Sequence, residues 1–145
     1  MRIIVEKPNG NEEDSIIVRC RHVSQELLSY LNAQATQSDK LVAYLNSQIH
    51  LLHPSKVFYI EAVDNKTFIY CEKAVYDSKQ KLYDLEKTLE FNDFLRVSKS
   101  LIVNLRNIRF LSPAFSGRLE AELKNGERVI ISRQYVPVLK KALGI

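Results

Sequence analysis

The chain is poor in several residue types that mark specialised classes of protein. Its 145 residues include only two cysteines, four glycines and four prolines, and no tryptophan. The cysteines, Cys20 and Cys71, match no CxxC or zinc spacing, which indicates free thiols in a reducing compartment. No apolar run approaches the ~20 residues that a membrane-spanning helix needs. We therefore expect a cytoplasmic protein, with both thiols buried as small apolar groups and neither acting as a redox switch.

The sequence also lacks the common signatures of catalysis and of cofactor binding. It contains no GxSxG, Walker A or GxGxxG motif, and its four glycines are not clustered around a phosphate-binding loop. His50 and His53 lie three residues apart, but no Cys, Asp or Glu accompanies them at ligand spacing. We therefore predict that the protein is not an enzyme and that it has no metal, cofactor or small-molecule substrate.

What is present fits one globular domain with a small N-terminal addition. Hydrophobic residues make up 46% of the chain and charged residues 26%, which are ordinary globular values. A polar run over residues 34–38 marks the expected boundary, so the predicted units are residues 1–37 and residues 38–145. The first unit reads as a ββα extension, with strands over 2–7 and 15–20 and a helix that Ser24 caps.

The helix of the extension carries an apolar stripe at spacings of one to four residues, formed by Val23, Leu27, Leu28, Leu31 and Ala35. Such a stripe has to be covered by something. Packing on its own hairpin is the first expectation, and packing on a second copy, which would make a homodimer, is the next. Capture of the stripe by a membrane-protein regulator is a third alternative.

Residues 38–145 are dominated by short strand patterns, so the predicted fold class is mainly β with short helices. Strands are expected over 40–45, 48–52, 57–63, 67–72, 75–77, 94–97, 109–115, 118–123 and 128–132. Residues 101–105 fit either a strand or a helical turn, and Pro113 interrupts the pattern around it. Helices are expected over 81–90 and 135–143. The run Lys124-Asn125-Gly126-Glu127 is the strongest hairpin signal.

Acidic residues are missing from positions 94–119, although five basic residues lie there: Arg96, Lys99, Arg106, Arg109 and Arg118. Residues 1–37 carry four basic and five acidic side chains, whereas residues 38–145 carry seventeen basic and twelve acidic. A basic stretch without acids attracts polyanions. The same stretch is equally compatible with a solvated face whose charges pair with acids on neighbouring strands.

Three predicted loops of this basic domain carry groups that suit nucleic acid. Ser98-Lys99-Ser100 offers hydroxyls and an ammonium, Arg133 and Gln134 can bind guanine or adenine edges, and Lys66 and Thr67 stand at a hairpin tip. Each set alone is more simply a turn with a solvated charge. Residues 38–145 show no pair of close helices with a basic outer face, so any contact with DNA would use these loops.

The run Phe94-Leu95-Arg96-Val97-Ser98-Lys99-Ser100-Leu101-Ile102-Val103-Asn104 resembles the central signature of the LytTR DNA-binding domain of bacterial transcriptional regulators. The resemblance extends over residues 39–145. The supporting matches, in chain order, are Val57-Phe58-Tyr59-Ile60-Glu61-Ala62, Lys66-Thr67-Phe68-Ile69-Tyr70, Leu82–Glu90, Gly117-Arg118, Asn125-Gly126-Glu127 and Ser132-Arg133-Gln134-Tyr135.

The resemblance implies an elongated arrangement of short antiparallel strands whose loops enter successive major grooves, often on paired direct repeats in double-stranded DNA. Lys66 or Thr67, Ser98, Lys99 and Arg133 fall where the family contacts DNA. The pattern also matches at Arg96, Ser100, Asn104 and Arg118. Of these, Arg96 fits either a structural or a DNA-binding role, and Asn104 fits a structural one.

The sequence departs from most regulators of this family at its N-terminal end, because residues 1–37 leave no room for a phosphoacceptor receiver domain. It resembles the stand-alone regulators instead, some of which a membrane protein controls. We therefore predict a sequence-specific transcriptional regulator in which residues 1–37 serve assembly or regulation and do not read DNA. The alternative is a protein-interaction adaptor or inhibitory partner of the same fold, with weak or no DNA binding.

Overall fold

The computed structural model describes Gly10, residues 19–29 and residues 40–145. In the N-terminal extension, residues 25–29 are helical, and Ser24 caps them as predicted, because its Oγ accepts the amide of Leu27 at 3.1 Å. The two expected strands lie almost wholly outside the described residues, as do Leu31 and Ala35 of the apolar stripe. Val23 and Leu28 of the stripe are 57% and 39% exposed.

Residues 40–145 form a mostly β structure, which confirms the predicted fold class. The strands are β1 (Leu41–Leu45), β2 (Gln48–Leu52), β3 (Val57–Val63), β4 (Lys66–Cys71), β5 (Val75–Ser78), β6 (Phe94–Ser98), β7 (Leu101–Asn104), β8 (Ile108–Pro113), β9 (Leu119–Leu123) and β10 (Arg128–Ile131). The helices are α2 (Leu82–Thr88) and α3 (Val136–Leu143), with short 3-10 turns η1 (Pro54–Lys56), η2 (Leu105–Asn107), η3 (Phe115–Gly117) and η4 (Arg133–Tyr135). No helix among the described residues is long and apolar enough to cross a membrane.

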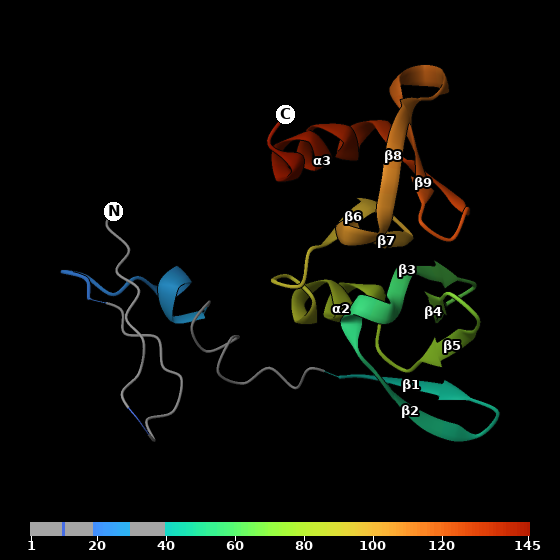
Figure 1. Cartoon of the computed structure of the whole chain (residues 1–145), viewed down its shortest axis with the longest axis horizontal. Coiled ribbons are helices and arrows are strands. Elements are labelled where there is room, and N and C mark those ends of the chain that lie inside the picture. Colours follow the sequence, from blue (N-terminus) through green and yellow to red (C-terminus); the bar gives the residue numbers. More distant parts are fainter. Residues whose placement is uncertain (1–9, 11–18, 30–39) are drawn as a thin grey trace.

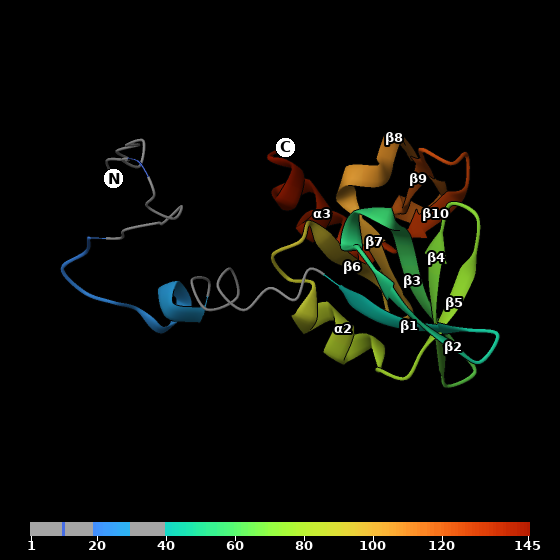
Figure 2. The same ribbon diagram turned by 60° about the horizontal axis from the view of Figure 1, so that its bottom comes forward.

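The strands form two antiparallel sheets. The larger sheet has the order β2-β1-β5-β4-β3-β7-β6, and the smaller one has the order β10-β9-β8. Figure 1 shows the larger sheet rising from the β1–β2 hairpin to β6 and β7, with the smaller sheet and α3 beyond it. In Figure 2, α2 lies on one side of the larger sheet, and α3 lies with β8–β10 on the other.

Each face of the larger sheet buries its own hydrophobic core. On one face, Leu82 and Leu85 of α2 pack with strand residues that include Ile60, Ile69 and Ile102. On the other face, side chains of β6 and β7 meet the smaller sheet and Leu139 of α3. The strand β7 is buried on both sides, so its run Leu-Ile-Val-Asn lacks the alternation typical of a half-exposed strand. This explains why its pattern also fitted a helical turn.

Two of the hairpins turn through residues in the left-handed conformation. Asn46 and Ser47 have φ values of 50° and 63°, and Asp64 and Asn65 have values of 50° and 62°. Positive φ values at both central residues are typical of the two-residue type I′ turn, whose twist matches that of the antiparallel strands it joins. Asn and Asp adopt this left-handed conformation more readily than most other residues. The second turn is one residue shorter than predicted, because Lys66 already belongs to β4.

Asn104 has the structural role that the sequence suggested for it. It is 1% exposed, its Nδ2 donates to the Val57 carbonyl at 2.9 Å, and its Oδ1 accepts the Arg106 amide at 3.1 Å. The Asn107 side chain donates to the same Val57 carbonyl, also at 2.9 Å. Both asparagines therefore fix the end of β7 against the start of β3.

The two thiols differ in environment, which corrects the expectation that both are buried. Cys20 is exposed, and Cys71 is half-buried at the end of β4. Burial raises the pKa of the Cys71 thiol from its usual 9.0 to about 11. Because the thiolate is the reactive form, Cys71 is protected from thiol reagents near neutral pH.

We predict that a disulfide reagent at pH 8 modifies Cys20 much faster than Cys71. A Cys20→Ser variant, which isolates Cys71, should show only the slow phase. Between pH 9 and 11 the unfolded thiol ionises while the folded one does not, so the free energy of unfolding should fall as pH rises through this window. A Cys71→Ala variant should lack that part of the pH dependence. Equal labelling rates for the two thiols would contradict this assignment.

Candidate nucleic-acid interface

The predicted loop at residues 98–100 is a tight turn between β6 and β7. Ser98 ends β6, and its Oγ accepts the Ser100 amide at 3.2 Å. The Ser100 carbonyl accepts the amide of Ala62 in β3 at 2.8 Å. The backbone of the turn is therefore held from within and from the neighbouring strand, while the Lys99 side chain remains exposed at its tip.

The second predicted segment follows β10 and is joined to β6 by hydrogen bonds. The Ser132 amide donates to the Val97 carbonyl at 2.9 Å, and the Ser132 hydroxyl donates to the same carbonyl at 3.3 Å. Arg133 and Gln134 begin η4 directly after this attachment, and both are exposed. Two segments more than thirty residues apart in sequence are thus fixed side by side.

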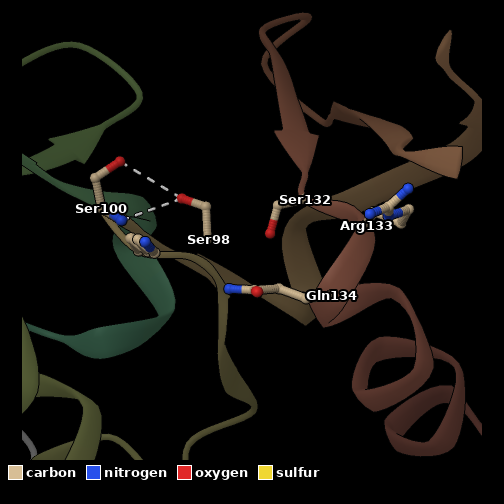
Figure 3. A pocket seen from close by; sticks show the side chains of 6 residues that line it. Ser98, Ser100, Ser132, Arg133 and Gln134 are labelled. Atoms are coloured by element: carbon tan, nitrogen blue, oxygen red, sulfur yellow. Dashed lines mark hydrogen bonds between the residues drawn. The ribbon is translucent and has the colours of Figure 1, made fainter. Parts of the chain in front are cut away.

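Between these segments lies an open groove with a volume of about 430 Å³. Its lining consists of Ser98, Lys99, Ser100, Ser132, Arg133 and Gln134. Figure 3 shows the Gln134 side chain reaching towards the strand that ends at Ser98, whereas Arg133 points away from that strand. The structure therefore brings two of the three predicted loops into one site.

Arg133 also contacts the loop between β8 and β9. Gly117 has a φ of +74°, and a Cβ placed on it would lie 3.2 Å from Cδ of Arg133. Only glycine combines this backbone conformation with room for the arginine side chain. Gly117 and its neighbour Arg118 therefore lie beside the groove, with Arg118 Nε donating to the Phe115 carbonyl at 2.9 Å.

The arginines of the acid-free stretch fall into two groups. Arg96 pairs with Glu86 at 3.0 Å, Arg106 with Asp93 at 2.5 Å and Arg109 with Glu122 at 3.8 Å, so three of the five charges are balanced by acids outside the stretch. Within the described part of the chain, no carboxylate forms an ion pair with Lys99, Arg118 or Arg133. The two cations of the stretch that lack such a pair, Lys99 and Arg118, thus lie at or beside the groove together with Arg133.

Arg96 acts as a structural residue. Its Nε donates to the Ser98 carbonyl at 2.8 Å, its Nη2 donates to the Lys99 carbonyl, and its Nη1 donates to Glu86 at 3.0 Å. The side chain is only 20% exposed. Each of its three nitrogens has a partner within the protein, which favours the structural one of the two roles that the sequence allowed.

The third predicted loop lies outside this groove, at the neighbouring turn between β3 and β4. Thr67 is 7% exposed and pairs in the sheet with Ala62, so its side chain offers almost no surface to a ligand. Lys66 is exposed at the start of β4. Because Ala62 is bonded to Ser100, this turn lies at the same edge of the sheet as the β6–β7 turn. Lys66, and not Thr67, is the candidate here.

A second hollow of about 280 Å³ adjoins the groove and was not predicted from the sequence. It shares Ser98 and Ser100 with the groove and adds Tyr59, Glu61 and Arg128. Tyr59 stacks on Tyr70 with 4.2 Å between the ring centroids, and burial together with the Glu127 carboxylate raises the pKa of its hydroxyl. Tyr59 and Glu61 are two residues apart in β3 and therefore lie on the same face of the strand. The sequence shows this spacing, but it does not show that Ser98, Ser100 and Arg128 lie beside them.

The two histidines considered as ligands have separate places in the fold. His53 Nδ1 accepts the Ser55 amide at 3.1 Å and so caps η1, and the His50 ring lies 5.1 Å from that of Tyr76. Among the residues that the structure describes, no group of three or more His, Cys, Asp or Glu side chains could hold a metal ion.

Comparison with known proteins gives consistent results for this domain. The family model of the LytTr DNA-binding domain matches residues 47–144. The chain is 31% identical over 140 residues to an uncharacterised HTH-type transcriptional regulator of Staphylococcus aureus strain bovine RF122 / ET3-1, covering 94% of this chain and 95% of that protein. A relative from strain NCTC 8325 / PS 47 is 30% identical over the same shares of the two chains.

A solved structure shares the fold. The LytTr DNA-binding domain of a Bacillus cereus protein described as a methyl-accepting/DNA response regulator superposes with a TM-score of 0.71 and 29% identity. The match covers 75% of this chain and all of that one. The staphylococcal relatives are named for a helix-turn-helix, but here α2 and α3 are separated by the strands β6–β10, so these two helices do not form that motif.

We predict that Lys99→Ala elutes from heparin at lower salt than the parent protein, because a cation without an acidic partner is lost from the groove. Arg118→Ala should behave in the same way. The matched controls are Arg106→Ala and Arg109→Ala, each of which removes an arginine that an acid already balances. Similar shifts for all four variants would mean that total charge, and not this surface, governs binding.

Proposed function

Because the chain belongs to the family of the LytTr DNA-binding domain, we propose that it regulates transcription by inserting the β6–β7 turn and the start of η4 into grooves of double-stranded DNA. The observation that carries this proposal is the groove itself, which gathers Lys99, Arg133 and Gln134 from distant parts of the chain. Lys66, at the neighbouring turn, would extend the contact along the duplex.

The residue types suit different contacts with DNA, some to phosphates and some to bases. Lys99 carries a compact charge at the tip of an exposed turn, which suits a phosphate, and the hydroxyls of Ser98 and Ser100 can accept or donate beside it. Arg133 can form two hydrogen bonds to guanine, and Gln134 can do the same with adenine. Lys99 would therefore supply affinity, and Arg133 and Gln134 would supply sequence preference.

This proposal carries several further expectations. The protein acts by binding and not by catalysis, it works in the cytoplasm, and it occupies paired direct repeats as a homodimer.

A DNA-binding surface made of turns is rigid only if the sheets behind the turns are rigid. The two hydrophobic cores that flank β6 and β7 provide that rigidity.

Sequence preference should change differently in two variants. We predict that Arg133→Ala relaxes the preference at one or two base pairs by ~1–3 kcal/mol, whereas Lys99→Ala weakens all sequences equally and lowers the slope of log K against log salt by about one. Selection from a random duplex pool, followed by titration at several salt concentrations, measures both effects. An Arg133→Ala protein that selects the parent sequence with the parent affinity would refute the role given to Arg133.

The alternative function, a protein-interaction adaptor, draws support from a different surface. Val42 and Leu51 are paired across the β1–β2 hairpin, and together with Ile49 they are 47%, 63% and 68% exposed. Such an apolar face can serve protein contacts. Salt-dependent selection of one DNA sequence by the parent protein would favour the regulator, and failure to select any sequence would favour the adaptor.

We also propose that residues 1–37 serve assembly or regulation and do not read DNA. Among the residues that the structure describes, both hydrophobic cores lie from Leu41 onwards, which supports residues 40–145 as the unit that holds the DNA-binding surface. In the extension, the side chains of Val23 and Leu28 are exposed, which supports an apolar surface for a partner.

Removal of residues 1–37 should leave the affinity for a single half-site unchanged and abolish cooperative binding to paired half-sites. Sedimentation and titration of the truncated and full-length proteins measure the two effects. A full-length Val23→Ser, Leu28→Ser variant is the matched control, because it keeps the chain length and changes only the exposed apolar side chains. A folded truncated protein that fails to bind even one half-site would show that the extension belongs to the DNA-binding surface.

A further inference from the structure

Arg96 lies at an irregularity in the pairing of β6 with β7. Arg96 pairs with Ile102 and Ser98 pairs with Leu101, so Val97 is an extra residue on β6. A bulge of this kind interrupts the regular ladder and leaves carbonyl groups that need other donors. The Ser98 and Lys99 carbonyls, which follow the bulge, receive the Nε and Nη2 hydrogens of Arg96.

The third nitrogen of Arg96 connects the turn to a different element. Nη1 donates to Glu86 Oε2 at 3.0 Å, and Glu86 belongs to α2, whose other side is packed in the core under the larger sheet. The guanidinium therefore joins the tip of the β6–β7 hairpin to a helix that is itself fixed. A lysine could not replace it, because one ammonium on a flexible stem does not hold three acceptors in a plane.

We propose that the pair of Arg96 and Glu86 is a clamp that holds the β6–β7 turn in its DNA-reading conformation before DNA arrives. This inference rests on the proposed function and assigns Arg96 and Glu86 as positioning residues. A turn that is already ordered spends less of its binding free energy on ordering when it meets a ligand. Loss of the clamp therefore weakens DNA binding although neither residue touches DNA.

Substitution of Glu86 tests the clamp, because a purely electrostatic role and a positioning role predict opposite changes in DNA affinity. If Glu86 only lowered the positive charge near the groove, then Glu86→Ala would tighten DNA binding. If Glu86 orients Arg96, the same change weakens binding, by about threefold for a half-exposed pair. The matched control is Glu90→Ala, which removes an exposed acid in the turn just after α2 without removing the partner of Arg96.

Arg96→Lys keeps the charge and removes the planar fork. We expect it to weaken binding about tenfold while leaving the salt slope unchanged, because no phosphate contact is lost. Glu86→Gln keeps an acceptor of the same reach and should bind close to the parent level. Thermal melting identifies any variant that has lost its fold. If Arg96→Lys does not fold, Glu86→Ala, which leaves Arg96 in place, decides the test.

Amide hydrogen exchange of the free protein tests the clamp without DNA. The Ser100 amide, which donates to Ser98 Oγ, should exchange about tenfold faster in Arg96→Lys than in the parent protein. Unchanged exchange, an Arg96→Lys protein with parent affinity, or equal tightening by Glu86→Ala and Glu90→Ala would overturn the clamp. If the parent protein bound no DNA, the proposed function would fail while the exchange measurement still decided whether the clamp exists.

Discussion

The hydrogen bonds from Ser132 to the Val97 carbonyl join the β6–β7 turn and the start of η4 into one groove. They connect the end of β10, in the smaller sheet, with β6, at the edge of the larger one. Val97 is the extra residue of the β6 bulge, and its side chain is completely buried in the core between the sheets. The bulge thus supplies a carbonyl for η4, while the buried valine fixes the position of that carbonyl.

The distribution of charge follows from the same arrangement. Arg96, Arg106 and Arg109 are balanced by acids on α2, before β6 and on β9, so they stabilise the domain or its surface and contribute little to a long-range field. Lys99 and Arg133 line one groove because the end of β10 is joined to β6. The acid-free stretch in the sequence therefore did not show which of its cations form ion pairs. The folded domain shows this for the residues that the structure describes.

Most local features of the fold could be predicted from the sequence, because they depend on neighbouring residues. The gaps between the expected strands located the turns after β1 and β3, and the expected helix over 81–90 contains α2. The strand β7 remained ambiguous because burial on both faces removes alternation. Long-range facts were out of reach: the burial of Thr67, the three protein partners of Arg96 and the exposure of Cys20 depend on residues far away in the chain. The resemblance and the loop analysis named Ser98–Ser100 and Arg133–Gln134 separately, and the structure showed that these segments line one groove.

The central claim is that the β6–β7 turn and the start of η4 bind one DNA molecule as a single surface. Titration of the isotope-labelled protein with a selected duplex, followed by amide NMR spectra, tests this most directly. We expect the resonances of residues 98–101 and 132–135 to shift together and to give one dissociation constant. Shifts confined to one of these segments, or centred on the β1–β2 hairpin, would contradict it.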